Sequence, residues 1–351
     1  MAVGVDIELT NRCNAVCNFC PRDQTPHTGL MTPEVFGKAL ERTVELREAE
    51  LSLLDEDDAV RSKVNLCGLG EPLLNKHAPA FISQVRAAGL DCQMSSNGAL
   101  LDERRGAAVL EAGLQAVWIN AGATGELYEK VYGLPFEKTL NNVVRFVETA
   151  GDQCEVHIVL VDFQHDPDHI ARMRTFWEDQ GISDFLQFEI MNRGGALFVD
   201  DMQYDAMPER AEALRLLEER GIQPFCVVPF IFLFVGYDGQ YYLCCSDWKK
   251  EVPLGSVFDH SFHDVVAKKF EHTASRNPIC KSCNHDPLNR LTEALHYAGG
   301  VPDDNFERMM DATAQGTEAA RNILHLLDPG LDFHSAATRS ASRRRIPLTS
   351  A

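Results

Sequence analysis

Strand-like and helix-like segments alternate through roughly the first 200 residues, and this rhythm limits the chain to a few folds. Alternating or continuous apolar runs typical of strands cover residues 3–9, 64–68, 91–95, 116–120, 155–161 and 185–190. Helical patterns between them cover residues 33–49, 78–88, 103–112, 136–149 and 167–180. Six such units predict an α/β fold with a parallel sheet and helices outside. The pattern alone does not separate a partial barrel from a doubly wound sheet.

Three cysteines, Cys13, Cys17 and Cys20, follow the first predicted strand directly. Thiolates this close in sequence can converge on one point. Four-iron clusters are held by thiolates, usually four, so three would leave one iron open to another ligand. A zinc site is the alternative, but no His or fourth Cys lies nearby: the next are His27 and Cys67.

Polar and glycine-rich turns follow the next strands, at the sheet edge where such folds place their active sites. The second strand leads into Gly68-Leu-Gly70-Glu71-Pro, and the third into Ser95-Ser-Asn97-Gly. Asn120 ends the fourth strand, and residues 125–133 are expected to form a polar, aromatic loop, with a surface helix as the alternative. Glycines let backbone groups approach a ligand closely, and the polar side chains supply hydrogen bonds.

A second group of cysteines lies near the other end of the chain. Residues 226–236 read as an apolar strand, a turn follows at 236–239, and the return strand leads into Cys244 and Cys245. Cys280 and Cys283 form a later C-x2-C pair. Four of these thiolates suit one iron–sulfur cluster or one zinc ion. The remaining cysteines, Cys67, Cys92 and Cys154, are expected to be buried core thiols.

Composition narrows the class of protein. Among 351 residues, 33 Lys and Arg against 52 Asp and Glu give a net charge of −19. Such a field disfavours nucleic acid and favours a cationic small molecule or partner, although solubility alone also explains it. No apolar run approaches membrane length and no leader precedes the first strand, so a cytoplasmic protein without a membrane partner is expected. The basic run 339–345 lies in a polar tail expected to be disordered.

The C-x3-C-x2-C spacing after the first strand resembles the signature of the radical S-adenosylmethionine (radical SAM) enzymes. The resemblance implies a partial (β/α)6 TIM-like barrel in residues 1–200, with Cys13, Cys17 and Cys20 holding a [4Fe–4S] cluster that binds SAM. It also implies that Gly70 and Glu71 belong to an element that grips the SAM amino group, although Leu69 replaces the usual glycine there.

Further SAM contacts are implied by the same resemblance. Ser95 and Asn97 match an element that bonds the ribose or carboxylate, and Phe19 takes the position of an aromatic beside the adenine. Asn120 stands where many relatives carry a serine. Arg193, in an Asn-Arg-Gly-Gly turn, would pair with the SAM carboxylate or a substrate group, or else serve as a cap or salt bridge.

The second group of cysteines, called here the rear cysteines, consists of Cys226, Cys244, Cys245, Cys280 and Cys283, and its spacing resembles that of a SPASM/twitch auxiliary-cluster domain. We place this domain at residues 201–290, followed by C-terminal helices (291–335) and a tail (336–351). The resemblance implies one auxiliary [4Fe–4S] cluster on Cys226, Cys244, Cys280 and Cys283. Cys245 is left over as an alternative ligand, an inert thiol or a hydrogen-atom donor.

The implied reaction begins with SAM cleavage to a 5′-deoxyadenosyl radical, which takes a hydrogen atom from a substrate C–H bond. An electron would come from a reductant such as flavodoxin or ferredoxin. The leading hypothesis is oxidation of a secondary alcohol to a ketone in a cationic aminocyclitol, similar to the aminocyclitol dehydrogenases of aminoglycoside pathways. Alternatives are an epimerase using Cys245, a peptide-modifying SPASM enzyme, and a non-enzymatic iron–sulfur or zinc protein.

Overall fold

The computed structural model of the chain describes residues 3–25, 27–53, 63–163, 166–197, 203–328 and 330. The tail expected to be disordered and its basic run lie outside these residues. So do residues 54–58 of the stretch 53–58, which is acidic and was expected to form a loop.

One curved sheet runs through the described chain and contains nine strands in the order β6-β5-β4-β3-β2-β1-β7-β8-β9. The first six strands are parallel, as the alternation predicts: β1 (Gly4–Ile7), β2 (Lys63–Leu66), β3 (Asp91–Ser96), β4 (Ala116–Asn120), β5 (Glu155–Asp162) and β6 (Phe185–Glu189). This is the partial barrel that the family resemblance implies.

The rear hairpin continues the same sheet. β7 (Phe232–Val235) pairs in parallel with β1, and β8 (Gln240–Tyr242) and β9 (Pro253–Ser256) follow antiparallel. The first and last parts of the chain therefore share backbone hydrogen bonds at β1.

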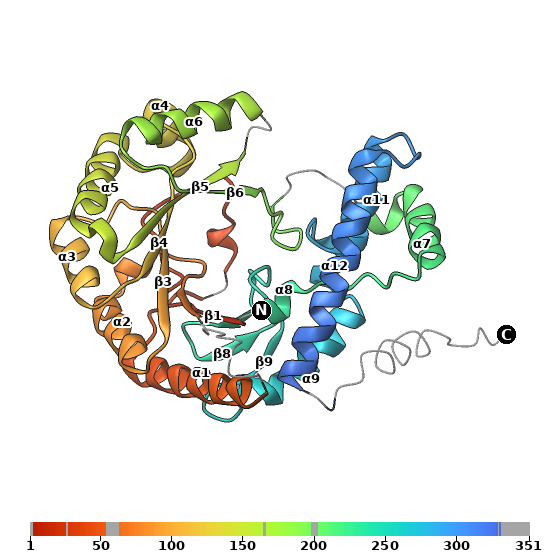
Figure 1. Ribbon diagram of the computed structural model, residues 1–351, viewed down its shortest axis with the longest axis horizontal. Coiled ribbons are helices and arrows are strands. Elements are labelled where there is room, and N and C mark those ends of the chain that lie inside the picture. Colours follow the sequence, from red (N-terminus) through yellow and green to blue (C-terminus); the bar gives the residue numbers. More distant parts are fainter. Residues whose placement is uncertain are drawn as a thin grey trace.

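Six helices cover the outside of the parallel strands (Figure 1): α1 (Pro33–Leu53), α2 (Ala78–Ala87), α3 (Glu103–Glu111), α4 (Gly125–Tyr132), α5 (Phe136–Ala150) and α6 (Pro167–Asp179). Their starts follow the sequence signals: Asp102 and Asp166 cap α3 and α6 by accepting backbone N–H bonds. One set of strand side chains, including Val5, Ile7, Val64 and Met94, is fully buried in the main core. The alternate set faces the barrel interior.

The remaining helices are α7 (Glu209–Glu219), α8 (Val228–Ile231), α9 (Phe262–Ala274), α10 (Pro278–Ser282), α11 (Pro287–Tyr297) and α12 (Asp304–Leu327). In Figure 1, α8, α9 and α12 lie on the side of β7–β9, and α7 and α11 lie farther out. α7, α11 and α12 share a second, smaller core that includes Leu217, Leu291 and Phe306.

Two local predictions were wrong. Residues 125–133 form helix α4 rather than a loop, because Tyr128, Val131 and Tyr132 recur at helical spacing and are buried. The apolar run 226–236 is also not one strand, since its first half turns into the short helix α8 before β7 begins. Pro229 within that run is compatible with the first turn of a helix and not with a ladder hydrogen bond.

Among the described residues, no helix combines the length and the apolar character needed to cross a membrane.

Candidate iron–sulfur and SAM site

The loop that carries Cys13, Cys17 and Cys20 lies against the end of α4. Val16 N–H donates to Tyr132 O (2.9 Å) and Asn18 N–H to Val131 O (3.1 Å). Gly133 ends α4 with a left-handed φ of 65°, and a Cβ there would overlap Val16. Helix α4 therefore supports the cysteine loop.

The three front thiols lie close enough to influence one another. Burial raises the pKa of Cys17 to about 12, with smaller contributions from the neighbouring Cys20 and Cys13. Burial also raises the pKa of Cys13 and of Cys20. Mutual repulsion of this kind is relieved when a cation binds the thiolates. A purely thiol donor set on one loop fits an iron–sulfur cluster.

Gly70 brings the turn after β2 against the cysteine loop. A Cβ on Gly70 would lie 2.4 Å from both Thr10 O and Arg12 O, and the next residue, Glu71, donates its N–H to Arg12 O (2.9 Å). Only glycine allows this approach.

The Glu71 carboxyl joins the turns after β2 and β3. It accepts hydrogen bonds from Asn97 N (2.8 Å), Ser96 Oγ (3.0 Å) and Leu73 N (3.2 Å). Burial raises the pKa of Glu71 to about 7, although these bonds oppose the rise. The carboxyl is thus engaged inside the protein.

Asn97 reaches the cysteine loop from the other side. Its amide donates to Asn14 Oδ1 (2.9 Å) and lies 3.7 Å from Cys13 Sγ. Ser95 lies on the inner face of β3 and is partly exposed, whereas Ser96 supplies the hydroxyl that binds Glu71. The sequence reading singled out Ser95 and missed the role of Ser96.

Phe19 and Asn120 lie at the same edge of the barrel. The Phe19 ring packs edge-on to Tyr132 (5.6 Å between centroids) and nearly parallel to Phe163 (6.2 Å). Asn120 ends β4 and is half-buried, and the turn after it is held by Tyr132 Oη, which accepts from Gly122 N (2.9 Å).

Arg193 lies between the front and rear cysteines. Its backbone has a left-handed φ of 51°, and its guanidinium stands 5.0 Å from the Trp248 ring centroid. Burial raises the pKa of both Cys20 and Cys245, and the charge of Arg193 opposes each rise. Arg193 therefore sits where it can act on groups at either cysteine set.

The turn around Arg193 is fixed to the C-x2-C loop by two asparagines. Asn192 N–H donates to Asn284 Oδ1 (2.9 Å), and Asn284 N–H donates back to Asn192 Oδ1 (3.1 Å). Gly194 and Gly195, both with positive φ, pack so closely that added Cβ atoms would meet Ile279 and Ser282. This contact explains the two glycines of the motif.

The four predicted rear ligands lie close enough for their charges to affect one another. Burial raises the pKa of Cys226 well above its usual range, and Cys283, Cys244 and Cys280 each raise it further. Cys245 differs, because the charge of Asp6, as well as that of Cys283, raises its pKa. No three His, Cys, Asp or Glu side chains of the described residues are grouped tightly enough to hold a single metal ion. In a four-iron cluster each thiolate binds a different iron, so its ligands need not meet at one point.

Lys269 is a buried charged residue beside the segment that leads into Cys244, and the sequence analysis did not single it out. It is fully buried, and its ammonium donates to Leu243 O (2.7 Å), Tyr242 O (3.0 Å) and Pro229 O (3.1 Å). Burial lowers its pKa to about 8. The signal was available, because Lys269 occupies the buried face of α9 together with Val265, Val266 and Phe270.

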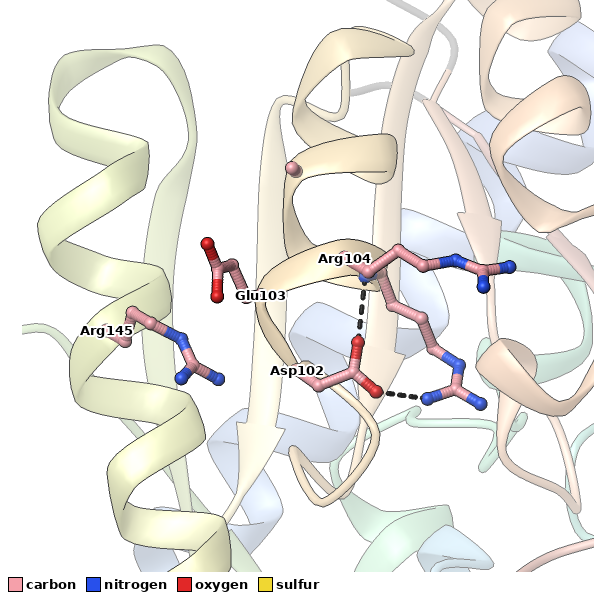
Figure 2. A pocket seen from close by; sticks show the side chains of 6 residues that line it. Asp102, Glu103, Arg104 and Arg145 are labelled. Carbon is pink, nitrogen blue, oxygen red and sulfur yellow. Dashed lines mark hydrogen bonds and ion pairs between the residues drawn. The ribbon is translucent and has the colours of Figure 1, made fainter.

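The structure also has an open hollow of about 690 Å³ on the outer helical layer, between α3 and α5 (Figure 2). Asp102, Glu103, Arg104, Arg105, Ala107 and Arg145 line it. Asp102 accepts hydrogen bonds from the Arg105 backbone and side chain, so its charge is paired at the surface. None of the predicted site residues lies there.

Two family models match the chain. The model of the radical SAM superfamily matches residues 7–175, and the SPASM model, described as an iron–sulfur cluster-binding domain, matches residues 226–284.

Curated relatives match parts of the chain. A GTP 3′,8-cyclase of Aquifex aeolicus (strain VF5) is 29% identical over 224 residues, which are 61% of this chain and 63% of that protein. An AdoMet-dependent heme synthase of Oleidesulfovibrio alaskensis is 24% identical over 155 residues, which are 43% of this chain and 36% of that protein. The chain therefore spans between about one third and two thirds of the length of these relatives.

A solved structure titled "Native anSMEcpe with bound AdoMet" has a similar fold over most of the chain. It is 16% identical, covers 91% of this chain and 99% of its own, and superposes with a TM-score of 0.55.

Proposed function

The chain is a radical SAM enzyme with a C-terminal SPASM domain, and from this premise we propose that it oxidises a secondary alcohol of a cationic aminocyclitol-like substrate to a ketone. The two domains imply a SAM-binding [4Fe–4S] cluster, an auxiliary cluster and SAM. When bound, SAM and its cluster supply a radical that removes a hydrogen atom from an unactivated C–H bond.

In this proposal Cys13, Cys17 and Cys20 hold the first cluster, and Cys226, Cys244, Cys280 and Cys283 hold the second. The all-thiol composition of both sets supports the assignment. We infer that SAM would bind beside the first set, through Phe19, Gly70, Ser95, Asn97, Asn120 and Arg193. Glu71 would act by holding the turn of Asn97 in place, because its carboxyl is already bonded there.

The observation that carries the oxidation is the position of the rear thiols beside the barrel. β7 pairs with β1, and Cys244 and Cys245 follow β8 in the same sheet. Lys269 fixes the two carbonyls just before Cys244. Cys226, Cys244, Cys280 and Cys283 would hold an auxiliary cluster there, which would supply an acceptor for the second electron of an alcohol oxidation.

The charge of the chain supports a cationic substrate. The net charge is −19, and the inner face of β1 carries the carboxylate of Asp6. The name of the relative from Aquifex aeolicus indicates an anionic nucleotide substrate for that protein. An excess of acidic groups argues against the same substrate here.

The test is product analysis with an aminocyclitol probe. Anaerobically reconstituted protein is reduced with dithionite and incubated with SAM and 2-deoxystreptamine, together with its monoamino analogues. The proposal expects a ketone and 5′-deoxyadenosine in equal amounts by mass spectrometry. A product of unchanged mass, or no product from any of these probes, would contradict it.

Epimerisation is the second candidate, and the placement of Cys245 favours it. Cys245 is partly exposed. The charges of Arg193 and Asp6, which are not among the proposed cluster ligands, influence its pKa. An epimerase would incorporate solvent deuterium at the inverted carbon and would stall in Cys245→Ala. The dehydrogenase would tolerate that substitution. A flavodoxin or ferredoxin reductant and a cytoplasmic location stay predictions.

A further inference from the structure

The inner face of the barrel is polar where β1, β2 and β3 run side by side. Asp6 pairs in register with Asn65, and Asn65 with Gln93, so the three side chains form one level across the sheet. Phe234 of β7 completes this level on the other side of Asp6. Closed parallel barrels usually fill such levels with branched apolar residues. In this chain the level is polar instead, and Asp6 is the acidic residue among the three.

Two other carboxylates near the ends of β1 and β2 are already engaged. Glu8 accepts from Lys250 Nζ (2.7 Å), Leu69 N (3.0 Å) and Tyr237 N (3.2 Å). Glu71 binds the turn after β3 through three donors. The oxygens of these two carboxylates are therefore occupied by protein donors and are poorly placed to accept a proton from a substrate.

Asp6 is held by fewer donors than either, because its carboxyl has two hydrogen-bond partners among the described residues, both neutral, instead of three. Asn65 Nδ2 donates to Asp6 Oδ1 (2.8 Å), and the thiol of Cys67 is the second partner. The sequence predicts that Cys67 is a buried core thiol, but in the structure it is partly exposed. The charges of Asp6 and Cys245 raise its pKa. The positive charge of Lys269, on α9, lowers the pKa of Asp6, while its ammonium donates its hydrogen bonds to backbone carbonyls.

We propose that Asp6 is the proton acceptor of the alcohol oxidation, an inference that rests on the proposed function. After the carbinol carbon has lost its hydrogen atom, the O–H bond of that carbon breaks and its proton moves to an Asp6 carboxylate oxygen. The carbon–oxygen double bond forms, and the remaining electron leaves to the auxiliary iron–sulfur cluster as oxidant. One hydrogen atom, one proton and one electron are thereby removed, which balances the conversion of alcohol to ketone.

The position of Asp6 suits the loss of both the proton and the electron from the substrate. It belongs to β1, the strand that pairs with β7, and its charge acts on Cys245, next to the proposed ligand Cys244. The proton and the electron would therefore leave toward the same side of the barrel. A carbinol radical loses both most readily when acceptors for each are close together.

The acid strength of Asp6 is compatible with this role. Burial raises its pKa from 3.8 to about 6, while Asn65, Cys67 and Lys269 oppose the rise. The group is then ionised at neutral pH yet basic enough to accept a proton, which is the range in which a general base works best. Lys269, Cys67 and Cys245 are the other titratable groups that face it.

The test compares wild type, Asp6→Asn and the control Gln93→Asn, all reconstituted with iron and sulfide as full-length chains. Gln93 shares the level of Asp6 but has no acidic group. With 2-deoxystreptamine and its monoamino analogues as probes, Asp6→Asn should lower ketone formation by about 10²–10⁴-fold, as expected for loss of a general base. It should still cleave SAM, so 5′-deoxyadenosine would accumulate without ketone. Gln93→Asn should keep the two products in equal amounts.

A second measurement does not depend on turnover. Infrared pH titration of the cluster-loaded chain, labelled with ¹³C-carboxyl aspartate, gives the ionisation of Asp6 as the difference between wild type and Asp6→Asn. Titration near pH 6 supports the proposal, and titration below about pH 4.5 overturns it. Ketone formation by Asp6→Asn at the wild-type rate also overturns it while leaving the oxidation intact. A wild type that makes no ketone removes the proposed function, and the role of Asp6 with it.

Discussion

Glu8 and Lys250 form a buried salt bridge, with 2.7 Å between Glu8 Oε2 and Lys250 Nζ, that ties the first strand of the barrel to the segment after the rear Cys244-Cys245 pair. The two side chains are 0% and 6% exposed. Lys250 also stands over the rings of Tyr242 (4.3 Å), Tyr237 (5.3 Å) and Phe234 (5.5 Å). One lysine thus joins the strand that leads into the front cysteines to the hairpin that carries the rear ones.

Lys250→Ala should lower the free energy of unfolding by about 3–5 kcal/mol, because it leaves Glu8 as a buried, uncompensated charge. Urea unfolding of the reconstituted protein measures the change. The double variant Glu8→Gln/Lys250→Met should recover most of the loss, since it removes both charges. Arg105→Ala is the matched control: its pair with Asp102 is exposed and should contribute about 0–1 kcal/mol. Equal losses in the two single variants would show that the buried pair has no special role.

Gly70→Ala should destabilise the front site by about 1–3 kcal/mol, because the added methyl would force the backbone oxygens of Thr10 and Arg12 apart. The variant should bind SAM more weakly and load less iron at the first cluster. Gly37→Ala is the control, since Gly37 lies in α1 with open space around its Cβ position. That variant should be stabilised by roughly 0.5–1 kcal/mol. SAM binding is measured by equilibrium dialysis, and wild-type affinity in Gly70→Ala would refute the close-contact explanation.

The sequence could predict the six parallel strands because each is a short apolar run bounded by turn residues, as Ala116–Asn120 illustrates. It could also place the cysteines, because ligand spacing is a local property. For α4 a loop was the first expectation and a surface helix the alternative, because Glu126, Glu129 and Lys130 make the segment polar. Burial of Tyr128 and Tyr132 shows which face of the helix packs inside the protein.

Contacts between distant segments could not be predicted. The Asn192–Asn284 pair and the Glu8–Lys250 pair join residues 92 and 242 positions apart, and neither has a local signal. The pairing of β7 with β1 was missed for the same reason: strand order depends on tertiary packing and not on any single segment. Asp6 looked like an ordinary polar residue of an alternating strand until the register placed it beside Asn65.

Iron content should separate the two proposed clusters. The triple variant Cys13/Cys17/Cys20→Ala should retain about four irons per chain after anaerobic reconstitution, with Mössbauer spectra of one cubane cluster. The four rear thiols remain intact in this variant and act on one another as a group. Cys92→Ala is the control, because Cys92 is buried in β3, outside both sets, and should load iron like the wild type. Complete loss of iron from the triple variant would remove the proposed electron acceptor.

Asp6→Asn should stabilise the chain, and the gain should depend on pH with a definite sign. The pKa of Asp6 is raised from 3.8 to about 6 in the folded chain, so the folded state holds this proton more tightly than the unfolded state. Stability is therefore lost as pH rises through that window, and above it the ionised carboxyl costs roughly 3 kcal/mol. Asn avoids this cost, so the variant should match the wild type near pH 4 and exceed it at pH 7–8.

Asp102→Asn supplies a control of opposite sign. The Asp102 carboxyl caps α3, and the Arg105 backbone N–H that it accepts lowers its pKa. Its contribution is present above the unfolded pKa and disappears as pH falls, so replacing it should cost stability at neutral pH and little in acid. Urea unfolding of both variants and the wild type between pH 4 and pH 8 gives the comparison. A gain for Asp6→Asn that is the same at every pH would mean that side-chain packing, and not a buried charge, sets the stability at this position.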